Sequence, residues 1–350
     1  KSNLAQVKII NMKEEIKKSK SYFSNDLLNA IKQRHEKGEQ TLIFLNRRGY
    51  NTSLHCLKCD YIFKCKHCDI TLTYHKKENI LSCHSCGFKT RTAQNCPECK
   101  SSEYIKYKGF GTEHIQSALY AIFPNIKTIR IDRDTTTQKH SHETLFKQFK
   151  SGKADILIGT QMIVKGLHFP SVTLVGILNT DGALNIPDFR SSETVFQLVT
   201  QACGRAGRSS LPGEVIIQSY MPENATIKLA SQQDYLGFYA SEIENRKFFG
   251  YPPFSQMAKI VIASQDEKKA ENFSNFFRDK LIKSLTSGYK IHPVLPSGRA
   301  KVKDVFRFQF LIRGKNMPLL SSILDKVKNE LNLPHSISLF IDIDPISTFF

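Results

Sequence analysis

The stretch ETLFKQFKSGKADILIG, residues 143–159, contains the pattern that decides the fold. Its first half predicts an amphipathic helix over Glu143–Lys150, and its second half predicts a short buried strand over Asp155–Ile158. Because the same alternation recurs along the chain, the sequence predicts an α/β domain with a parallel sheet covered by helices on both faces. The other expected helices are Ser24–Lys37, Thr112–Phe123 and Ser191–Arg208, and the other expected strands are Thr41–Leu45, Lys127–Ile131, Ser171–Leu178 and Gly213–Ser219.

The size and composition of the chain are those of a folded protein with more than one domain. It has 350 residues, of which 40% are hydrophobic and 23% charged, so two domains are expected, or three if one is small. No apolar run approaches the roughly 18 residues that a membrane span needs. Residues 1–20 are too polar for a secretory signal. We therefore expect a soluble, cytoplasmic protein.

The charge balance favours a polyanionic partner. Fifty lysines and arginines against 32 acidic residues give a formal net charge of +18. Two zinc sites of four thiolates each would lower this to about +14. A basic surface of this size favours nucleic acid, because each phosphate that it neutralises releases a condensed counterion. The alternative is an ordinary lysine-rich, solvated surface.

The cysteines predict metal sites. Eight of the nine cysteines occur in four Cys-x-x-Cys pairs, and each such pair lets two thiolates reach one tetrahedral Zn²⁺. Disulfides are the alternative, but they do not persist in the reducing compartment expected for this chain. A redox Cys-x-x-Cys would occur once rather than four times. The pairs are Cys56/Cys59, Cys65/Cys68, Cys83/Cys86 and Cys96/Cys99.

Loop lengths favour a nested arrangement of two sites. Five residues between Cys59 and Cys65 are few for folding two adjacent pairs around one ion, whereas 14 residues between Cys68 and Cys83 suffice for a zinc-ribbon hairpin. The expected sites are Cys65, Cys68, Cys83 and Cys86 for one zinc ion, and Cys56, Cys59, Cys96 and Cys99 for the other. Sequential pairing is the alternative. Nearby histidines such as His67 are not needed, and closed four-sulfur sites are structural.

The character of the sequence changes after the Tyr251-Pro252-Pro253-Phe254 segment. The later part predicts a β-α-β-β-α-β order, which is a compact α+β domain of about a hundred residues. We therefore expect the α/β domain to begin at 1–54, to be interrupted by a zinc-binding insertion at 55–107, and to continue at 108–250, followed by an α+β domain at 251–350. The expected strands are Gln256–Ala263, Ile291–Leu295, Val305–Arg313 and Ser336–Ile341, and the helices are Glu267–Leu285 and Pro318–Leu331.

Several ordered motifs, together with the cysteine array and Pro187-Asp188-Phe189-Arg190, resemble the PriA-type replication restart helicases, also called primosomal protein N′. This resemblance covers essentially the whole chain. It implies a second RecA-like helicase lobe with a two-zinc insertion, followed by a DNA-binding C-terminal domain. The motifs are Phe44-Leu45-Asn46-Arg47-Arg48-Gly49-Tyr50, Arg130-Ile131-Asp132-Arg133-Asp134-Thr135-Thr136, Gly159-Thr160-Gln161-Met162 with Lys165-Gly166, and Gln201-Ala202-Cys203-Gly204-Arg205-Ala206-Gly207-Arg208.

The last motif is similar to the sixth motif of superfamily 2 helicases, which faces a nucleotide held by the other lobe. The resemblance implies that Arg208 is the arginine finger, Arg205 its partner, and Gln201 a group that orients phosphate or water. We expect the two arginines to share a face of the helix. A basic helix end that complements the helix dipole is the alternative. The resemblance also places four residues near the nucleotide, namely Gly159, Lys165, Gly204 and Gly207.

DNA contacts are implied in three places. The resemblance assigns Thr160 and Gln161 to the DNA backbone, although Gly-Thr-Gln at a strand end is also an ordinary turn. Arg47, Arg48 and Tyr50 are expected along the DNA track, although Arg-Arg-Gly also serves as a turn. In the strand that alternates phenylalanines with basic residues, we expect Phe306, Phe308 and Phe310 to face the core. The basic residues, including Lys301 and Arg307, would then contact phosphate.

The chain contains no G-x-x-x-x-G-K-[ST] phosphate loop and no Asp-Glu-x-His magnesium motif. In helicases of this type both belong to the first lobe, which we expect upstream of residue 1. ATP and Mg²⁺ would therefore be bound mainly by that lobe, and this chain alone is expected to be inactive as an ATPase.

The resemblance implies the C-terminal half of an ATP-dependent 3′-to-5′ DNA helicase that restarts stalled replication forks and assembles the primosome. Its implied partners are forked and single-stranded DNA, single-strand-binding protein and primosome proteins, and a monomer is expected. A non-enzymatic zinc-ribbon DNA-binding module is the alternative, but it gives no reason for the Gln201–Arg208 motif. A degenerate helicase that serves as a scaffold is a third reading.

Overall fold

In a computed structural model, the chain divides into two compact units. The described residues are 5–349 except for 20, 46–52, 57, 58, 60, 62, 68–70, 76–78, 84, 85, 104, 109, 110, 133–140, 161, 162, 164–168, 207–211, 286, 287 and 332. The first unit comprises residues 1–50, 110–186 and 190–242, and the second comprises 51–109, 187–189 and 243–350. The cysteine-rich segment thus groups with the C-terminal residues. The finer domain boundaries stay predictions.

The first unit is built on a parallel sheet of six strands among the described residues, in the order β1-β11-β10-β2-β9-β8. The five strands expected from the sequence are present with small changes at their ends. An additional edge strand, β1, lies at the start of the chain, where polar residues hide the pattern. The strands are β1 (Gln6–Asn11), β2 (Gln40–Leu45), β8 (Thr128–Ile131), β9 (Ile156–Gly159), β10 (Val172–Leu178) and β11 (Glu214–Ser219).

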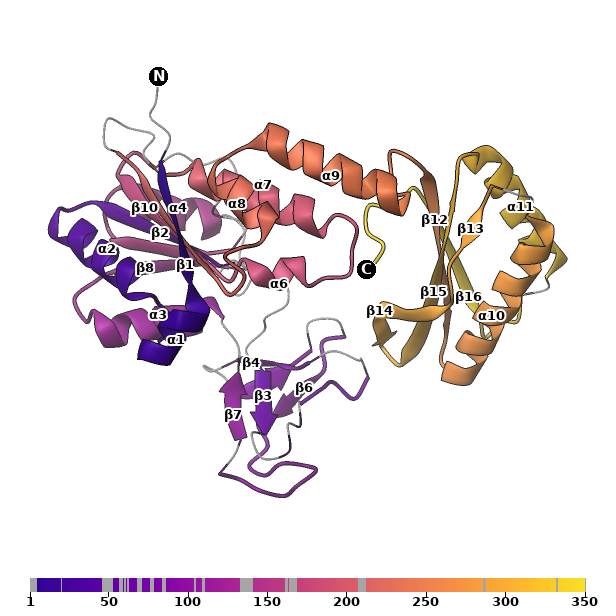
Figure 1. The fold of residues 1–350 in the computed structure, drawn as a ribbon. Helices are drawn as coiled ribbons and strands as arrows, with labels where there is room; N and C mark the ends of the chain where they lie inside the picture. The colour runs from indigo at the N-terminus through magenta and orange to yellow at the C-terminus, as the bar shows by residue number, and fades with distance from the viewer. Residues whose placement is uncertain are drawn as a thin grey trace. The chain divides into compact units, whose positions relative to one another are not determined.

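Helices cover both faces of this sheet, as the alternating pattern predicts (Figure 1). Successive residues of β2 point to opposite faces, so Leu42 and Phe44 join one apolar core while Ile43 and Leu45 join the other. Residues of α4 (Ser141–Lys150), α7 (Ser191–Cys203), α8 (Ala225–Ser231) and α9 (Tyr235–Phe249) belong to the first core. Residues of α1 (Met12–Ser19), α2 (Asn25–Glu36) and α3 (Thr112–Ile122) belong to the second. A short helix, α6 (Asp181–Leu184), follows β10.

Helix α7 is shorter than the predicted Ser191–Arg208. It ends at Cys203 with Gly204 as its C-cap, and the Gly204 N–H donates to the Thr200 carbonyl at 3.0 Å. The Arg205 N–H then donates to the Ala202 carbonyl at 3.0 Å, which is a turn beyond the helix. Glycine ends a helix readily because it lacks a side chain that would favour continuing it. The prediction that Arg205 and Arg208 share a helix face is therefore wrong for Arg205, and Arg208 lies outside the described residues.

The cysteine-rich part of the second unit consists of two small antiparallel sheets. Strands β3 (Ser53–Cys56) and β7 (Ile105–Lys108) form one sheet, and β4 (Thr73–His75), β5 (Ile80–Ser82) and β6 (Lys89–Arg91) form the other. Among the described residues of this part, the apolar core includes cysteines. Its buried described members are Leu54, Phe63, Cys65, Leu72, Leu81 and Cys83. Small modules of this kind commonly gain stability from cross-links.

The C-terminal domain contains an antiparallel sheet in the order β13-β15-β12-β16, and β14 pairs with β15. The predicted single strand Ile291–Leu295 is wrong, because two strands occupy this region. Pro293, which lies between the two strands, lacks the N–H that a continuous ladder requires. The elements are β12 (Gln256–Ser264), α10 (Glu267–Ser284), β13 (Lys290–Ile291), β14 (Leu295–Val302), β15 (Val305–Gly314), α11 (Met317–Glu330) and β16 (Ser338–Ile343).

The C-terminal segment, residues 344–349, is attached to this domain by polar contacts. Lys259 Nζ donates to the Ser347 carbonyl at 2.9 Å, and Gln309 Nε2 donates to the Thr348 carbonyl at 2.8 Å. Asp188, which belongs to the second unit together with Pro187 and Phe189, accepts from Ser347 Oγ at 2.6 Å and from the Thr348 N–H at 2.9 Å. The Pro187–Arg190 motif therefore has a structural task in holding the end of the chain.

Replacing Asp188 by Ala is expected to loosen the C-terminal segment. The change leaves the buried Thr348 N–H without its acceptor, which costs about 1–3 kcal/mol. Hydrogen exchange measured by mass spectrometry should then show faster exchange over residues 347–349. Asp325→Ala, which alters an exposed carboxylate on α11, is the matched control and should exchange like the unaltered chain. Equal protection of residues 347–349 in all three proteins would contradict this role of Asp188.

Candidate functional site

Four cysteines bring their sulfur atoms together in the cysteine-rich part of the second unit. The Sγ atoms of this outer cluster all lie within 4.8 Å of one another, with Cys56 Sγ 3.5 Å from Cys99 Sγ and Cys59 Sγ 3.6 Å from Cys96 Sγ. A tetrahedron of sulfurs around zinc has edges of about 3.8 Å, whereas a disulfide bond is about 2.05 Å long. The spacing therefore fits four thiolates around one metal ion. The outer cluster consists of Cys56, Cys59, Cys96 and Cys99.

A second group, the inner cluster, contains Cys65, Cys83 and Cys86, whose Sγ atoms also lie within 4.8 Å of one another. Cys65 Sγ is 3.6 Å from Cys86 Sγ. The fourth expected ligand, Cys68, lies outside the described residues. These sulfur positions agree with the nested arrangement rather than with the sequential one, because Cys56 and Cys59 gather with the most distant pair in the sequence.

Short backbone turns place the cysteines. In the Cys83–Cys86 turn the Gly87 N–H donates to the Cys83 carbonyl at 2.9 Å, and in the Cys96–Cys99 turn the Lys100 N–H does the same to Cys96 at 2.9 Å. The residue after the second cysteine has a left-handed backbone in both turns, with φ of 79° at Gly87 and 60° at Lys100. Glycine adopts this conformation without steric cost, so Gly87 is the residue that the inner turn requires.

Hydrogen bonds to sulfur favour the thiolate form that a metal requires. Ser101 Oγ lies 2.9 Å from Cys99 Sγ, and this hydrogen bond lowers the pKa of Cys99 to about 6. In the inner cluster the His67 N–H donates to Cys65 Sγ at 3.4 Å and the Phe88 N–H donates to Cys86 Sγ at 3.5 Å. The pKa of Cys59 shifts in the opposite direction to that of Cys99, because the lowering effect of a backbone hydrogen bond with Tyr61 is outweighed by burial and the neighbouring cysteines, which raise it to about 12. The ninth cysteine, Cys203, belongs to neither cluster, and burial in α7 raises its pKa to about 12. The clusters therefore suit a thiophilic ion, and an all-sulfur tetrahedral donor set is typical of structural zinc.

The described members of the sixth-motif segment surround the end of α7. Gln201 lies exposed in its last turn, Gly204 forms the C-cap, and Arg205 is half-buried in the following turn. Part of the Arg205 side chain is enclosed, since its Nε atom is buried. Gly207 and Arg208, which complete the motif, lie outside the described residues.

The expected fifth-motif residues follow β9. Gly159 is its last residue, and a β-carbon there would lie 2.7 Å from the Ile131 carbonyl oxygen. Packing between β8 and β9 therefore requires glycine independently of any nucleotide. Thr160 is only 7% exposed, so its side chain offers little surface to DNA. The other expected contacts in this region, Gln161, Lys165, Arg47, Arg48 and Tyr50, lie outside the described residues.

Asp132 belongs to the Arg130–Thr136 motif, for which no role was predicted from the sequence. Its side chain contacts the start of α3. Its buried carboxylate accepts a short hydrogen bond from Thr112 Oγ1, in the first turn of α3. It also pairs with Arg130 Nε at 3.2 Å, and Arg130 lies 3.7 Å from Glu113. This network satisfies a buried charge, so the motif contributes to the stability of the lobe.

The basic residues of the C-terminal domain mostly have partners within the chain. Lys301 Nζ donates to the Lys66 carbonyl at 3.2 Å, and Arg313 Nε donates to His292 Nε2 at 2.8 Å. Arg307 is half-buried on β15, while Phe308 and Phe310 are buried as expected. The phosphate contacts expected of Lys301 and Arg307 stay predictions. No helix in the described part of the chain has the length and apolarity that crossing a bilayer demands.

Three family models match successive parts of the chain. Residues 65–91 match the PriA DNA helicase Cys-rich region (CRR) domain, residues 99–210 the helicase conserved C-terminal domain, and residues 247–346 the primosomal protein N C-terminal domain. Together with the parallel sheet and the cysteine clusters, these matches define the class of protein. It is a helicase C-terminal lobe of the RecA-like kind with a cysteine-rich zinc-ribbon module and a C-terminal domain.

Curated relatives identify the family. The chain is 46% identical over 349 residues to the replication restart protein PriA of Chlamydia pneumoniae and 41% identical over 347 residues to that of Bacillus subtilis. These alignments cover 99% and 98% of this chain but 47% and 43% of the relatives. The chain therefore belongs to the PriA family and spans about half the length of these relatives. A solved structure, S. cerevisiae Dbp5 bound to RNA and ADP BeF3, is 13% identical with a TM-score of 0.33 over 70% of this chain and 45% of that one.

Proposed function

We propose that this chain is the second-lobe half of an ATP-dependent 3′-to-5′ DNA helicase that restarts stalled replication forks and assembles the primosome. The observation that carries the proposal is the sequence identity of 41–46% to PriA proteins over almost the entire chain. The alignments cover almost the whole chain and so take in the sixth-motif segment. Gly204 ends α7, so Arg205 follows in a turn rather than in the helix.

The proposed division of labour between the lobes follows from the chemistry of phosphoryl transfer. An arginine has a fixed charge and a planar fork, so it can stabilise charge that develops on a γ-phosphate. We assign this role to Arg208, with Arg205 as its partner and Gln201 orienting phosphate or water. Gly159, Gly204, Gly207 and Lys165 are assigned to the surroundings of the nucleotide. ATP and Mg²⁺ would be held mainly by the phosphate loop of the upstream lobe.

The cysteine clusters are proposed to hold two structural zinc ions. The outer ion would be bound by Cys56, Cys59, Cys96 and Cys99, and the inner ion by Cys65, Cys68, Cys83 and Cys86. Four thiolates leave no open position for a substrate, so the metal would act as a cross-link for a module with a very small apolar core. The thiolate-favouring hydrogen bonds of Ser101, His67 and Phe88 support this assignment.

The proposed partners are forked and single-stranded DNA, single-strand-binding protein and primosome proteins. The formal net charge of +18 supports a polyanionic partner. Among the basic residues proposed for DNA contact, Arg307 is partly accessible on β15. We propose a cytoplasmic location and a monomeric state.

The proposal predicts that ATPase activity requires both halves. The 350-residue chain alone should hydrolyse ATP no faster than the background reaction, because it has no phosphate loop. The same chain joined to its upstream half should hydrolyse ATP when DNA is added and should unwind forked DNA in the 3′-to-5′ direction. Steady-state phosphate release and strand separation measure both activities.

A non-enzymatic zinc-ribbon DNA-binding module is the competing function. It predicts DNA binding by the isolated chain and no DNA-stimulated turnover by the joined protein. The absence of turnover, with zinc and DNA binding retained, would therefore reject the motor assignment.

A further inference from the structure

A two-residue turn at the tip of the β14–β15 hairpin has an unfavourable backbone. Lys303 and Asp304 join the paired residues Val302 and Val305, and both have left-handed φ values, 53° and 58°. Turns of this kind favour Asn, Asp and Gly, because a left-handed backbone costs most other residues roughly 1–2 kcal/mol. Asp304 therefore suits this turn, whereas Lys303 carries most of the backbone cost, and the side chain of Asp304 makes further contacts beyond the hairpin.

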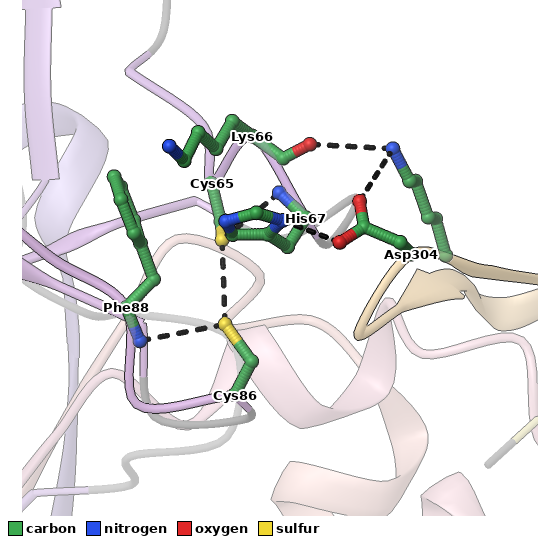
Figure 2. Close-up of polar contacts among 7 residues, drawn as sticks. Cys65, Lys66, His67, Cys86, Phe88 and Asp304 are labelled. Carbon is green, nitrogen blue, oxygen red and sulfur yellow. Dashed lines mark hydrogen bonds and ion pairs between the residues drawn. The ribbon is translucent and has the colours of Figure 1, made fainter.

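Contacts of the hairpin join it to the backbone of the Cys65–His67 segment (Figure 2). The Asp304 N–H donates to the His67 carbonyl at 2.8 Å, and the Asp304 carboxylate makes a short contact with His67 Nδ1. Lys301 Nζ donates to the Lys66 carbonyl at 3.2 Å and lies 3.4 Å from Asp304 Oδ1. Val302 also packs against the apolar core of the cysteine-rich module.

The Cys65–His67 segment also contacts the sulfur of Cys65. The carbonyl of Lys66 and the N–H of His67 belong to one peptide group, which accepts from Lys301 and donates to Cys65 Sγ at 3.4 Å. An ammonium group on the carbonyl polarises that peptide and strengthens its N–H as a donor to sulfur. The His67 ring packs edge-on against Phe88 at 5.3 Å between centroids. Lys66 Nζ lies 4.8 Å from the centroid of the Phe88 ring.

We propose that Asp304 and Lys301 are positioning residues of the inner metal site, although they lie in the C-terminal domain. They fix the backbone of the Cys65–His67 segment so that its N–H points at a ligand sulfur. Retention of metal by the inner cluster and docking of the hairpin therefore stabilise each other, because such coupling is reciprocal. The inference rests on the proposed zinc assignment and goes beyond it, since it makes the metal of one module depend on another domain.

The test follows loss of zinc from each cluster separately in the full 350-residue chain. Zinc-loaded protein is mixed with excess chelator and N-ethylmaleimide, and mass spectrometry measures alkylation of Cys65 and Cys99 as reporters of the inner and outer clusters. Asp304→Gly removes the carboxylate while glycine relaxes the turn. We expect Cys65 to be alkylated about 10-fold faster than in the unaltered chain, in line with substitutions in outer-shell partners of metal ligands, whereas Cys99 should be unchanged. Lys301→Ala should also increase the rate of alkylation of Cys65.

Two controls separate this role from general stability. Lys303→Gly relaxes the other left-handed residue of the turn but keeps Asp304, and Asp325→Ala removes a distant exposed carboxylate. Both should leave the alkylation of Cys65 unchanged. Equal rates at Cys65 in Asp304→Gly and the unaltered chain would overturn the coupling while two zinc ions per chain upheld the metal assignment. A purified chain without zinc would overturn both.

Discussion

Replacing Arg208 by Ala, in a protein that joins this chain to its upstream half, is expected to lower DNA-stimulated ATP turnover by about 10³- to 10⁵-fold, the range measured for arginine fingers. The large effect follows from the charge that develops on the γ-phosphate, which a neutral side chain leaves unstabilised. Arg208→Lys keeps the charge but lacks the planar fork, so it should remain strongly impaired. Steady-state phosphate release with saturating DNA measures the loss.

The position of Arg205 sharpens this experiment. It lies half-buried in the turn after α7, so Arg205→Ala is expected to reduce turnover as well, but by a smaller factor than Arg208→Ala. Lys37→Ala removes one exposed positive charge from the same lobe and is the matched control. DNA affinity should be equal in all four variants. Full turnover by Arg208→Ala, with normal DNA binding, would contradict the assignment of the finger.

The second large effect concerns the outer cysteine cluster. Cys96 is completely buried among its partners, and Cys96→Ala is expected to reduce the zinc content from two ions per chain to one. Apparent binding free energies of about 10–16 kcal/mol for structural zinc are folding free energies as well. The ribbon around the outer cluster should therefore lose its structure. Elemental analysis by mass spectrometry counts the zinc, and hydrogen exchange over residues 96–101 reports the unfolding.

The ninth cysteine provides the matched control for this experiment. Cys203 is buried in α7 and takes no part in either cluster, so Cys203→Ala should retain two zinc ions per chain. The parallel sheet of the first unit should stay protected in both variants, because its described apolar cores contain no residue of the cysteine clusters. Retention of two tightly bound zinc ions by Cys96→Ala would be incompatible with the proposed ligand set.

Much of this protein was determined by patterns that act over a few residues. The helix and strand of residues 143–159 alternate because apolar side chains recur with the period of a helix and then form a continuous run. This pattern was enough to predict the parallel sheet. The Cys-x-x-Cys spacing likewise predicted the clusters, because two residues between ligands let a short turn direct both sulfurs to one point. Even the nested grouping followed from loop lengths.

Other features required the folded chain. The end of α7 at Cys203 and the split at Pro293 are local events that the apolar pattern conceals, because propensity and hydrogen bonding compete there with periodicity. The contacts of Asp188 with Ser347 and of Asp304 with His67 join residues 159 and 237 positions apart. A short-range pattern has no information about such pairs, since their polar groups become neighbours only when the strands and turns around them have packed. The sequence therefore determined the lobe and predicted the metal ligands, whereas the tertiary structure decided which distant side chains contact them.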